Sequence, residues 1–156
     1  MANEMSTVGF AIGYCPEASA GTRPTTAYTK IPNVYSISEI NPEPATYDVT
    51  DLSDLEWKRS IPALKDEVGN ISLGVHLNPT FRTAWGSLVT AYQSAASANK
   101  AMWFEVLPLN DTHGFFFEGV PISLGLPGIE TDSVFEGDVY ITVGKIEAWQ
   151  TKATIS

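Results

Sequence analysis

The sequence predicts a mainly β fold with one α-helix, arranged as a β-sandwich or small barrel with the helix packed on the sheet. Two observations support this fold class. Segments with strand-like alternation or β-rich composition occur both before and after a single stretch with helical periodicity. Breaks containing proline or glycine separate these segments, and a length of 156 residues suits one domain. We therefore expect residues 1–156 to form a single domain, with no additional immunoglobulin-like domain.

The N-terminal part of the chain contains the weakest strand signals. Residues 1–27 are rich in Gly, Thr, Ala and Pro, and we interpret them as an N-terminal arm and loop. Within them, the short apolar run at residues 8–14 predicts an edge strand or an arm. A β-rich segment at residues 31–40 predicts a strand. This strand should end before Pro42 and Pro44, because proline cannot donate a hydrogen bond to a neighbouring strand.

Residues 41–67 form a polar segment about twice as long as the structureless loops that compact domains usually contain. Loops of this length are usually functional or disordered. The segment nevertheless carries apolar side chains at irregular spacing, too many for a solvated linker. They are Tyr47, Val49, Leu52, Leu55, Trp57, Ile61 and Leu64. We therefore expect this loop to become ordered against another subunit.

A half-buried strand and a capped helix follow in direct succession. Residues 71–77 carry apolar side chains at the odd positions, which is the period of a strand. Asn78 and Pro79 then supply an N-cap and a proline in the first helical turn. We expect a helix from residue 80 to about residue 98, ended by Asn99 and packed on the sheet. Its apolar stripe comprises Phe81, Trp85, Leu88, Val89, Tyr92, Ala95 and Ala96.

The last third of the chain predicts further strands. Residues 102–109 form a continuous apolar run typical of a buried strand, and residues 114–126 predict its hairpin partner. A turn near Asn110 would connect the two. Residues 133–149 predict one long strand, or two strands with a bend at Gly137. In this segment apolar and polar side chains alternate, so one face should be buried.

The charge balance argues against binding to a nucleic-acid backbone. The net charge is −9 and the pI is about 4.5, whereas binding to phosphates requires Lys and Arg to displace counterions. The N-terminus lacks the basic and apolar regions of a signal peptide, and no stretch reaches the ~18 apolar residues of a membrane span. We expect the protein to be made and assembled in a cytoplasm, without a membrane.

No set of residues in the sequence points to catalysis or metal binding. His76 and His113 are isolated, whereas a metal site needs three or four ligands at suitable spacing. Asp111 and His113 lack a serine in a nucleophile-elbow motif, and nothing near Cys15 would activate its thiol. We therefore expect a protein that is not an enzyme and needs no cofactor. A carbohydrate-binding β-sandwich is an alternative, with sugar-stacking residues among Trp57, Trp85, Trp103 and Trp149.

Three stretches of the chain carry a family resemblance. The first is YDVTDL at residues 47–52 followed by SIPALKD at residues 60–66. The second is GNISLGVHLNPTFRTAWGSLVTAY, and the third is FFFEGVPISLGLPGIETDSVFEGDVYITVGKIEAW. Their order and spacing resemble the major tail tube protein of long-tailed, siphophage-type bacteriophages, over roughly residues 30–149. The chain departs from the family pattern at Ala63, where glycine is common, and at Val68, which adds a residue.

The resemblance implies a structural protein of the virion tail. Six subunits would form a ring whose inner sheets join into a continuous β-barrel, and stacked rings would form a hollow tube around a tape-measure protein. Tail terminator and distal tail proteins would be further partners. DNA would pass through the lumen during ejection without specific binding. The tube protein of a contractile tail or of a secretion machine shares this fold and stays an alternative.

Two groups of residues are the candidate functional positions under this resemblance. The family's long loop bridges subunits or rings, so the oligomer interface should include Tyr47, Val49, Thr50, Leu52, Trp57, Lys58, Arg59, Ile61, Pro62, Leu64, Lys65 and Asp66. The basic side chains of this loop either pair with an acidic patch on a neighbour or form weak local salt bridges. Between Lys100 and Lys145 the chain has no Lys or Arg. Acidic side chains there would repel DNA from the lumen, and the candidates are Glu105, Glu118, Glu136 and Asp138.

Overall fold

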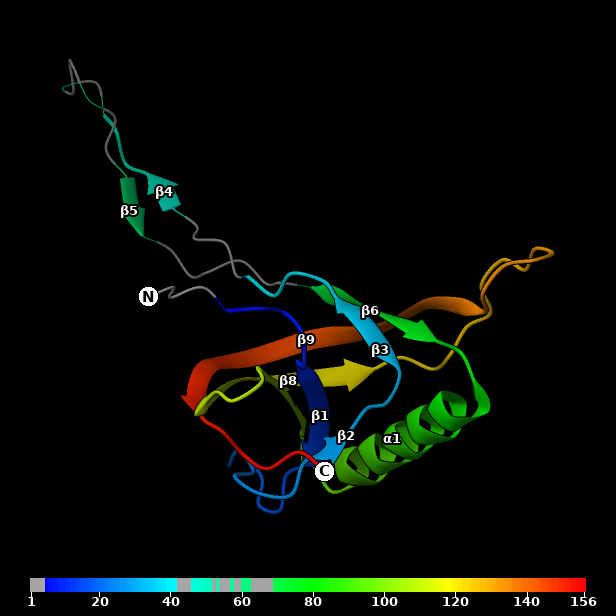
Figure 1. Cartoon of the computed structure of the whole chain (residues 1–156). Coiled ribbons are helices and arrows are strands. Elements are labelled where there is room, and N and C mark those ends of the chain that lie inside the picture. Colours follow the sequence, from blue (N-terminus) through cyan, green and yellow to red (C-terminus); the bar gives the residue numbers. More distant parts are fainter. Residues whose placement is uncertain (1–4, 42–45, 52, 54–56, 58–59, 63–68) are drawn as a thin grey trace.

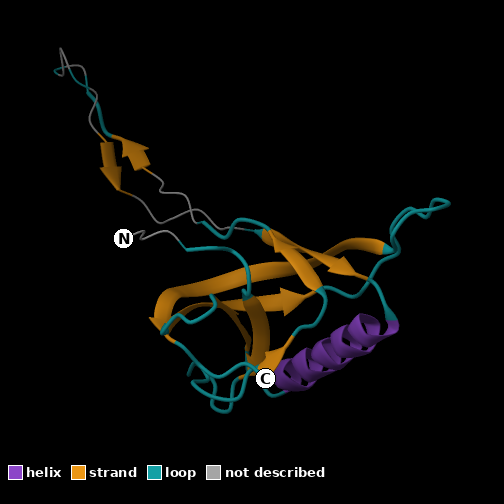
Figure 2. Cartoon of the chain, in the orientation of Figure 1, coloured by secondary structure: helices purple, strands orange, loops and turns teal. Residues whose placement is uncertain are grey.

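The computed structural model describes residues 5–41, 46–51, 53, 57, 60–62 and 69–156. Seven strands in this part of the chain form one sheet in the order β2-β1-β7-β8-β9-β6-β3, and every neighbouring pair is antiparallel. The sheet curls into a half-barrel beside the helix α1 (Figure 1), so the predicted mainly β class with one helix is confirmed (Figure 2). The strands are β1 (Ala11–Pro16), β2 (Thr29–Lys30), β3 (Val34–Ile37), β6 (Asn70–His76), β7 (Met102–Leu107), β8 (His113–Pro121) and β9 (Glu136–Thr151).

The helix α1 (Pro79–Ser97) begins and ends as the sequence predicts. The Asn78 side chain accepts a hydrogen bond from the Phe81 N–H at 2.9 Å, and Pro79 sits in the first turn, where its missing N–H leaves no helical bond unmade. At the other end, Asn99 has a φ of 57°, the left-handed conformation that commonly ends a helix. Both ends of α1 are therefore set by local sequence.

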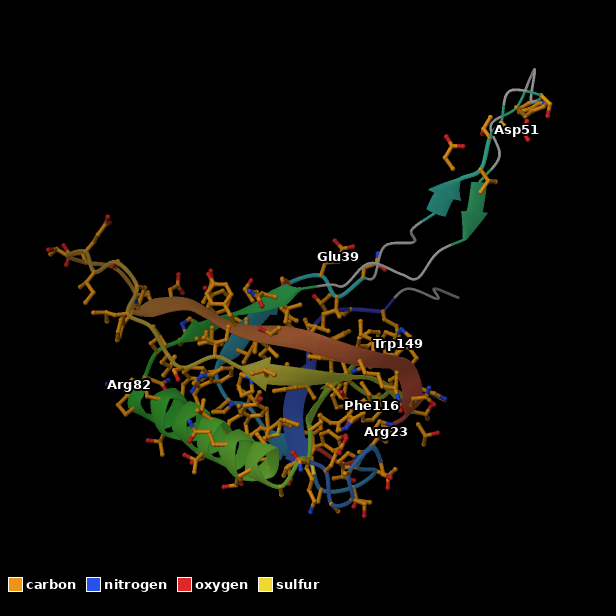
Figure 3. All side chains as sticks on the ribbon, turned by 180° about the vertical axis from the view of Figure 1, so that it is seen from behind. Arg23, Glu39, Asp51, Arg82, Phe116 and Trp149 are labelled. Carbon is orange, nitrogen blue, oxygen red and sulfur yellow. The ribbon has the colours of Figure 1, made fainter. Side chains whose placement is uncertain are left out.

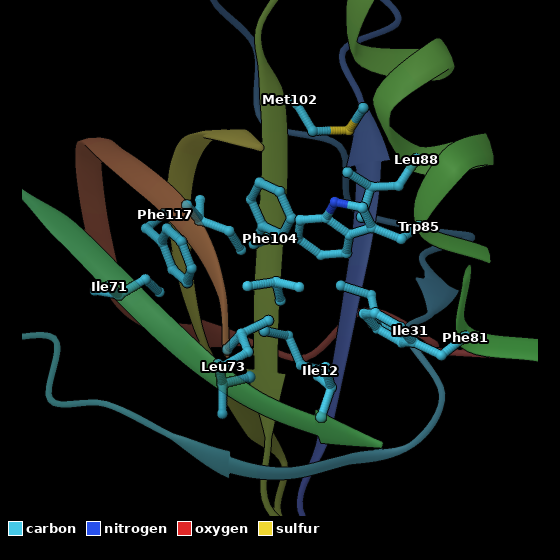
Figure 4. Close-up of a cluster of buried hydrophobic side chains, with 14 of the residues drawn as sticks. Ile12, Ile31, Ile71, Leu73, Phe81, Trp85, Leu88, Met102, Phe104 and Phe117 are labelled. Atoms are coloured by element: carbon cyan, nitrogen blue, oxygen red, sulfur yellow. The ribbon is translucent and has the colours of Figure 1, made fainter. Parts of the chain in front are cut away.

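The larger hydrophobic core lies between α1 and the concave face of the sheet (Figure 4). Phe81, Trp85 and Leu88 of α1 are at most 1% exposed and join a cluster with side chains of β1, β6, β7, β8 and β9. The indole N–H of Trp85 also donates to the carbonyl of Ile122 at 2.9 Å. The helix therefore closes the concave side of the sheet and fixes the start of the segment that follows β8.

A second, smaller core covers the opposite face of the sheet. Trp103 and Phe104 are neighbours on β7, so their side chains point to opposite faces, yet both are buried. Trp103 belongs to a cluster with Tyr28, Phe116 and Ala153. The C-terminal segment reaches this cluster by a parallel bridge beside Tyr28. The sheet is therefore covered on both faces at β7 and β8. A prediction that assumes one buried face for each strand would miss the second core.

Three strand predictions differ from the structure. The strand expected at residues 8–14 is β1, which starts later and is not an edge, because the two-residue β2 pairs with its outer side at Gly13 and Tyr14. The strand expected at residues 31–40 is limited to β3, whose pairing with β6 contains a register shift. The strand expected at residues 114–126 is β8, which ends at Pro121, and the last strand is the single β9, so residues 122–135 form a long loop between them.

Candidate assembly site

The long segment at residues 41–67 contains a small hairpin of its own. The strands β4 (Thr46–Asp48) and β5 (Ser60–Pro62) pair antiparallel, with Tyr47 opposite Ile61. They form a separate two-stranded sheet, and Figure 1 shows it standing away from the half-barrel. The backbone between the two strands begins with a tight turn, in which the Asp48 carboxylate accepts a hydrogen bond from the Thr50 N–H at 2.9 Å. The sequence predicted a loop here but not this hairpin.

The predicted interface residues of this segment divide into three groups. Tyr47 lies in β4, while Ile61 and Pro62 lie in β5. Val49 and Thr50 follow β4 at the surface, and Trp57 is 80% exposed. An apolar side chain as large as Trp57 favours burial against a partner, so the interface role stays a prediction with physical support. The remaining candidates lie outside the described residues: Leu52, Lys58, Arg59, Leu64, Lys65 and Asp66.

The four acidic candidates for the lumen do not share one environment. Glu136 and Asp138 are exposed at the start of β9, where the Glu136 carboxylate lies 3.6 Å from the His76 ring. Glu118 on β8 is half-buried, and burial raises the pKa of its carboxyl. Glu105 on β7 is fully buried. The prediction that Glu105 faces a lumen is therefore wrong, because the chain itself covers that carboxylate.

Glu105 is covered by the C-terminal segment and by the loop before β2. One carboxylate oxygen accepts a hydrogen bond from the Ala153 N–H at 3.1 Å. Among the described residues, the other oxygen has no hydrogen-bond partner, as is also true of one terminal nitrogen of Arg23. The Arg23 guanidinium stacks 4.2 Å from the centre of the Phe116 ring (Figure 3) and pairs with Glu147 at 2.7 Å. Burial raises the pKa of Glu105 to about 7, against the opposing effects of Ala153, Arg23 and Lys152.

This raised pKa predicts a pH-dependent stability. The folded state holds a proton on Glu105 up to about pH 7, whereas the unfolded chain releases it near pH 4.5. The folded state therefore binds more protons between these values, and stability falls as pH rises through this window. We expect the contribution of Glu105 to fall by about 3 kcal/mol across it, at about 1.4 kcal/mol per pKa unit.

The measurement is urea unfolding of the wild type and of Glu105→Gln at several pH values from 4.5 to 8. The Gln variant retains an acceptor for the Ala153 N–H but cannot ionise. Other carboxyls also titrate. Burial raises the pKa of Glu118, in the same direction as that of Glu105, whereas burial raises the pKa of Glu17 but hydrogen bonds from Trp103 and Gly21 outweigh it and lower the pKa overall. The difference between the two proteins isolates Glu105. A difference that stays constant with pH would contradict the assignment.

An open groove with an apolar floor lies between β1 and β3, where the half-barrel does not close. Its volume is about 1230 Å³. The floor is made by core side chains that include Ile12 and Val106, with Phe115 and Ile146 half-buried beside them. Its rim includes exposed aromatic side chains, Phe10 and Trp149. Sequence reasoning missed this groove because its walls come from segments far apart in the chain.

The loop at residues 122–135 is the second apolar surface that the sequence analysis missed. Its base is fixed, because the Ile122 N–H donates to Tyr140 at 3.1 Å and the Leu77 N–H donates to Phe135 at 3.0 Å. Figure 1 shows its tip projecting from the end of the half-barrel. The tip exposes large apolar side chains, with Leu126 at 74% and Ile129 at 71%. The sequence signal that could have revealed this surface is the presence of apolar residues in a turn that contains Gly and Pro.

The described part of the chain gives little support for a metal site, a membrane-spanning helix or a sugar-binding site. There, no group of three or more His, Cys, Asp or Glu side chains could hold a metal ion. No helix among the described residues is long and apolar enough to cross a membrane. Of the four candidate sugar-stacking residues, Trp85 and Trp103 are each 1% exposed, so they cannot stack on a ligand. Trp57 and Trp149 are exposed but belong to different segments.

Comparison with known proteins finds a solved structure with a similar fold. No protein-family model matches the chain, and no curated protein matches it. Among solved structures, it is similar to a chain of the "Cryo-EM structure of the anti-feeding prophage (AFP) baseplate, 6-fold symmetrised", with a TM-score of 0.63. The similarity covers 95% of this chain and 97% of that chain at 8% sequence identity. The two chains therefore share a fold over nearly their whole length.

Proposed function

We propose that this chain is a structural subunit of a phage-type tail, which assembles with copies of itself into hexameric rings that stack into the hollow tail tube. The observation that carries this proposal is the fold similarity over nearly the whole chain to a subunit of a six-fold symmetrised prophage baseplate. The resemblance in the three sequence stretches points to the same kind of assembly. A purely structural role, without catalysis or cofactor, is part of the proposal.

The physical chemistry of the surface supports self-association. The half-barrel leaves β2 and β3 as sheet edges, and an edge with unpaired backbone groups is a template for pairing with another chain. Exposed apolar side chains occur in several separate segments, including Val8, Trp57, Leu126 and Ile129. A monomer would leave this surface in water, whereas a closed ring of subunits would cover much of it.

The charge of the chain suits the passage of DNA. Glu136 and Asp138 are exposed, and they are the acidic candidates that remain best placed to face a lumen. Carboxylates along the wall of a channel repel phosphates, so DNA passes without binding. The further partners of the proposal are the tape-measure, tail terminator and distal tail proteins. Assembly would occur in the host cytoplasm and end in the virion tail.

A second candidate is a tube-type subunit of a contractile tail or of a secretion machine. The specific observation in its favour is that the similar solved chain comes from a prophage baseplate. Both candidates require hexameric rings and differ in the proteins that surround the tube. Self-assembly into rings would contradict the alternative that the chain is a monomeric carbohydrate-binding module.

Sedimentation velocity over a concentration series tests the proposal. The 16.9 kDa chain is expected to convert from monomer to a species of about six subunits, followed by larger species that grow in whole rings. Light scattering on the same samples gives the absolute mass. A chain that stays monomeric at every concentration would contradict the tube proposal, and sugar binding by that monomer would support the carbohydrate-binding alternative.

A further inference from the structure

We propose that the loop at residues 122–135 of one subunit docks into the groove between β1 and β3 of the next subunit. This inference rests on the proposed self-assembly and names a contact within it. The two surfaces have matching chemistry. The loop tip is an exposed apolar projection, and the groove is a recess with an apolar floor and an exposed aromatic rim.

The loop does not fill the groove of its own subunit, because no residue of the loop lines the groove and the tip side chains Leu126 and Ile129 are exposed. It joins β9 at Glu136, whereas the groove is lined by β9 residues from Gly144 to Trp149. About ten residues of β9 separate the loop from this wall, roughly 30 Å at ~3.3 Å per residue, while the other wall of the groove, at Val34 on β3, is joined through β6 to Gly137 near the loop. Figure 3 shows Trp149 at the end of the sheet opposite to the loop. A projecting tip and a recess that occupy different parts of the surface produce a head-to-tail contact between copies, which closes into a ring or continues as a filament.

The charges of the two surfaces are complementary. The loop carries Glu130 and Asp132, and there is no Lys or Arg between residues 122 and 138. Among the described residues that line the groove, Lys30 is the only one with a charged side chain, and it is exposed. Docking would bring the acidic side chains of the loop close to Lys30 at the rim of the groove, while the apolar tip of the loop would contact the apolar floor. Such rim charges set orientation more than affinity.

The size of the groove favours a protein segment as its occupant. Small-molecule pockets usually measure 300–1,000 Å³, and this groove is larger at about 1230 Å³ and open to solvent. Exposed aromatic residues beside an apolar recess are typical of the centre of a protein interface. Leu126, Ile129 and Val134 are each at least 67% exposed, so their burial in such a recess would favour association.

Two experiments on the full-length chain test this contact. In the first, Leu126→Ser combined with Ile129→Ser should raise the concentration at which assembly begins by about thirtyfold, which is ~2 kcal/mol at 1.4 kcal/mol per tenfold. The matched control is Val120→Ser, which removes an exposed apolar side chain from β8 instead of the loop. It should assemble like the wild type. Circular dichroism and thermal unfolding show that each variant is folded.

In the second experiment, Cys15 is replaced by Ser and two chains are mixed, one with Ile129→Cys and one with Trp149→Cys. A short bifunctional maleimide should cross-link the two chains to each other. It should not link Ile129→Cys with Tyr140→Cys, a control position exposed in the first half of β9. Equal linkage to the control, or linkage of Trp149→Cys to Trp57→Cys in place of Ile129→Cys, would overturn the proposed occupant.

The two experiments separate this inference from the function on which it rests. A wild-type chain that never assembles contradicts the proposed function. A wild-type chain that assembles, together with a loop variant that assembles at the same concentration, contradicts the docking contact alone.

Discussion

A chain lacking residues 48–64 is expected to fold normally and to lose the ability to polymerise. The hairpin β4–β5 belongs to a separate two-stranded sheet, and Figure 1 shows this sheet standing away from the half-barrel. Its removal therefore leaves the seven-stranded sheet, α1 and their packing in place. We expect the free energy of unfolding to change by less than about 1 kcal/mol, because surface changes away from the core are usually small.

The loss of assembly should be large, because the deletion removes the segment that carries the predicted interface residues, including the exposed Trp57. The measurement is sedimentation of the deletion variant beside the wild type, with urea unfolding of both as the check on folding. Substitution of Trp57 by Ser in the full chain is the milder control and should weaken assembly without abolishing it. Tubes of normal appearance from the deletion variant would contradict the bridging role of this segment.

Trp85→Ala is expected to destabilise the folded chain by about 3–5 kcal/mol, the usual cost of removing a large buried aromatic side chain. Trp85 is 1% exposed and stacks on Phe81 with ring centres 5.8 Å apart. The variant also loses the hydrogen bond to the Ile122 carbonyl. Since the total stability of a domain is about 5–15 kcal/mol, this change removes a large share of it.

Urea unfolding followed by circular dichroism measures this loss. Trp85→Phe keeps most of the packing and removes only the indole N–H, so it should cost about 1–3 kcal/mol by leaving the Ile122 carbonyl unpaired. Arg82→Ala, on the exposed side of the same helix, should change stability by no more than about 0.5 kcal/mol. Equal stability of Trp85→Ala and Arg82→Ala would contradict the placement of α1 on the sheet.

The parts of the fold that depend on neighbours in sequence could be predicted. The ends of α1 follow from Asn78, Pro79 and Asn99, each of which acts on the residues next to it. The strand β6 follows from alternation, because the apolar side chains at its odd positions, Ile71, Leu73 and Val75, are buried. The class of the fold follows from the order of such elements, so it was accessible without knowledge of the strand pairing.

The features that depend on distant parts of the chain could not be predicted. Glu105 was assigned to a lumen from its charge, but Ala153 of the C-terminal segment and the loop carrying Arg23 cover it. Its position between Phe104 and Val106, in a continuous apolar run, was the signal that it lies in a strand buried on both faces. The groove between β1 and β3 forms only when segments at both ends of the chain meet, so no local pattern marks it.

Negative-stain electron microscopy of the assembled wild-type chain tests the central claim most directly. Images of end-on particles should average to a ring of six equal densities around an open centre, and side views should show rings stacked into tubes of constant width. Class averages with compact particles that have no central opening, or with dimers that do not grow with concentration, would contradict the account.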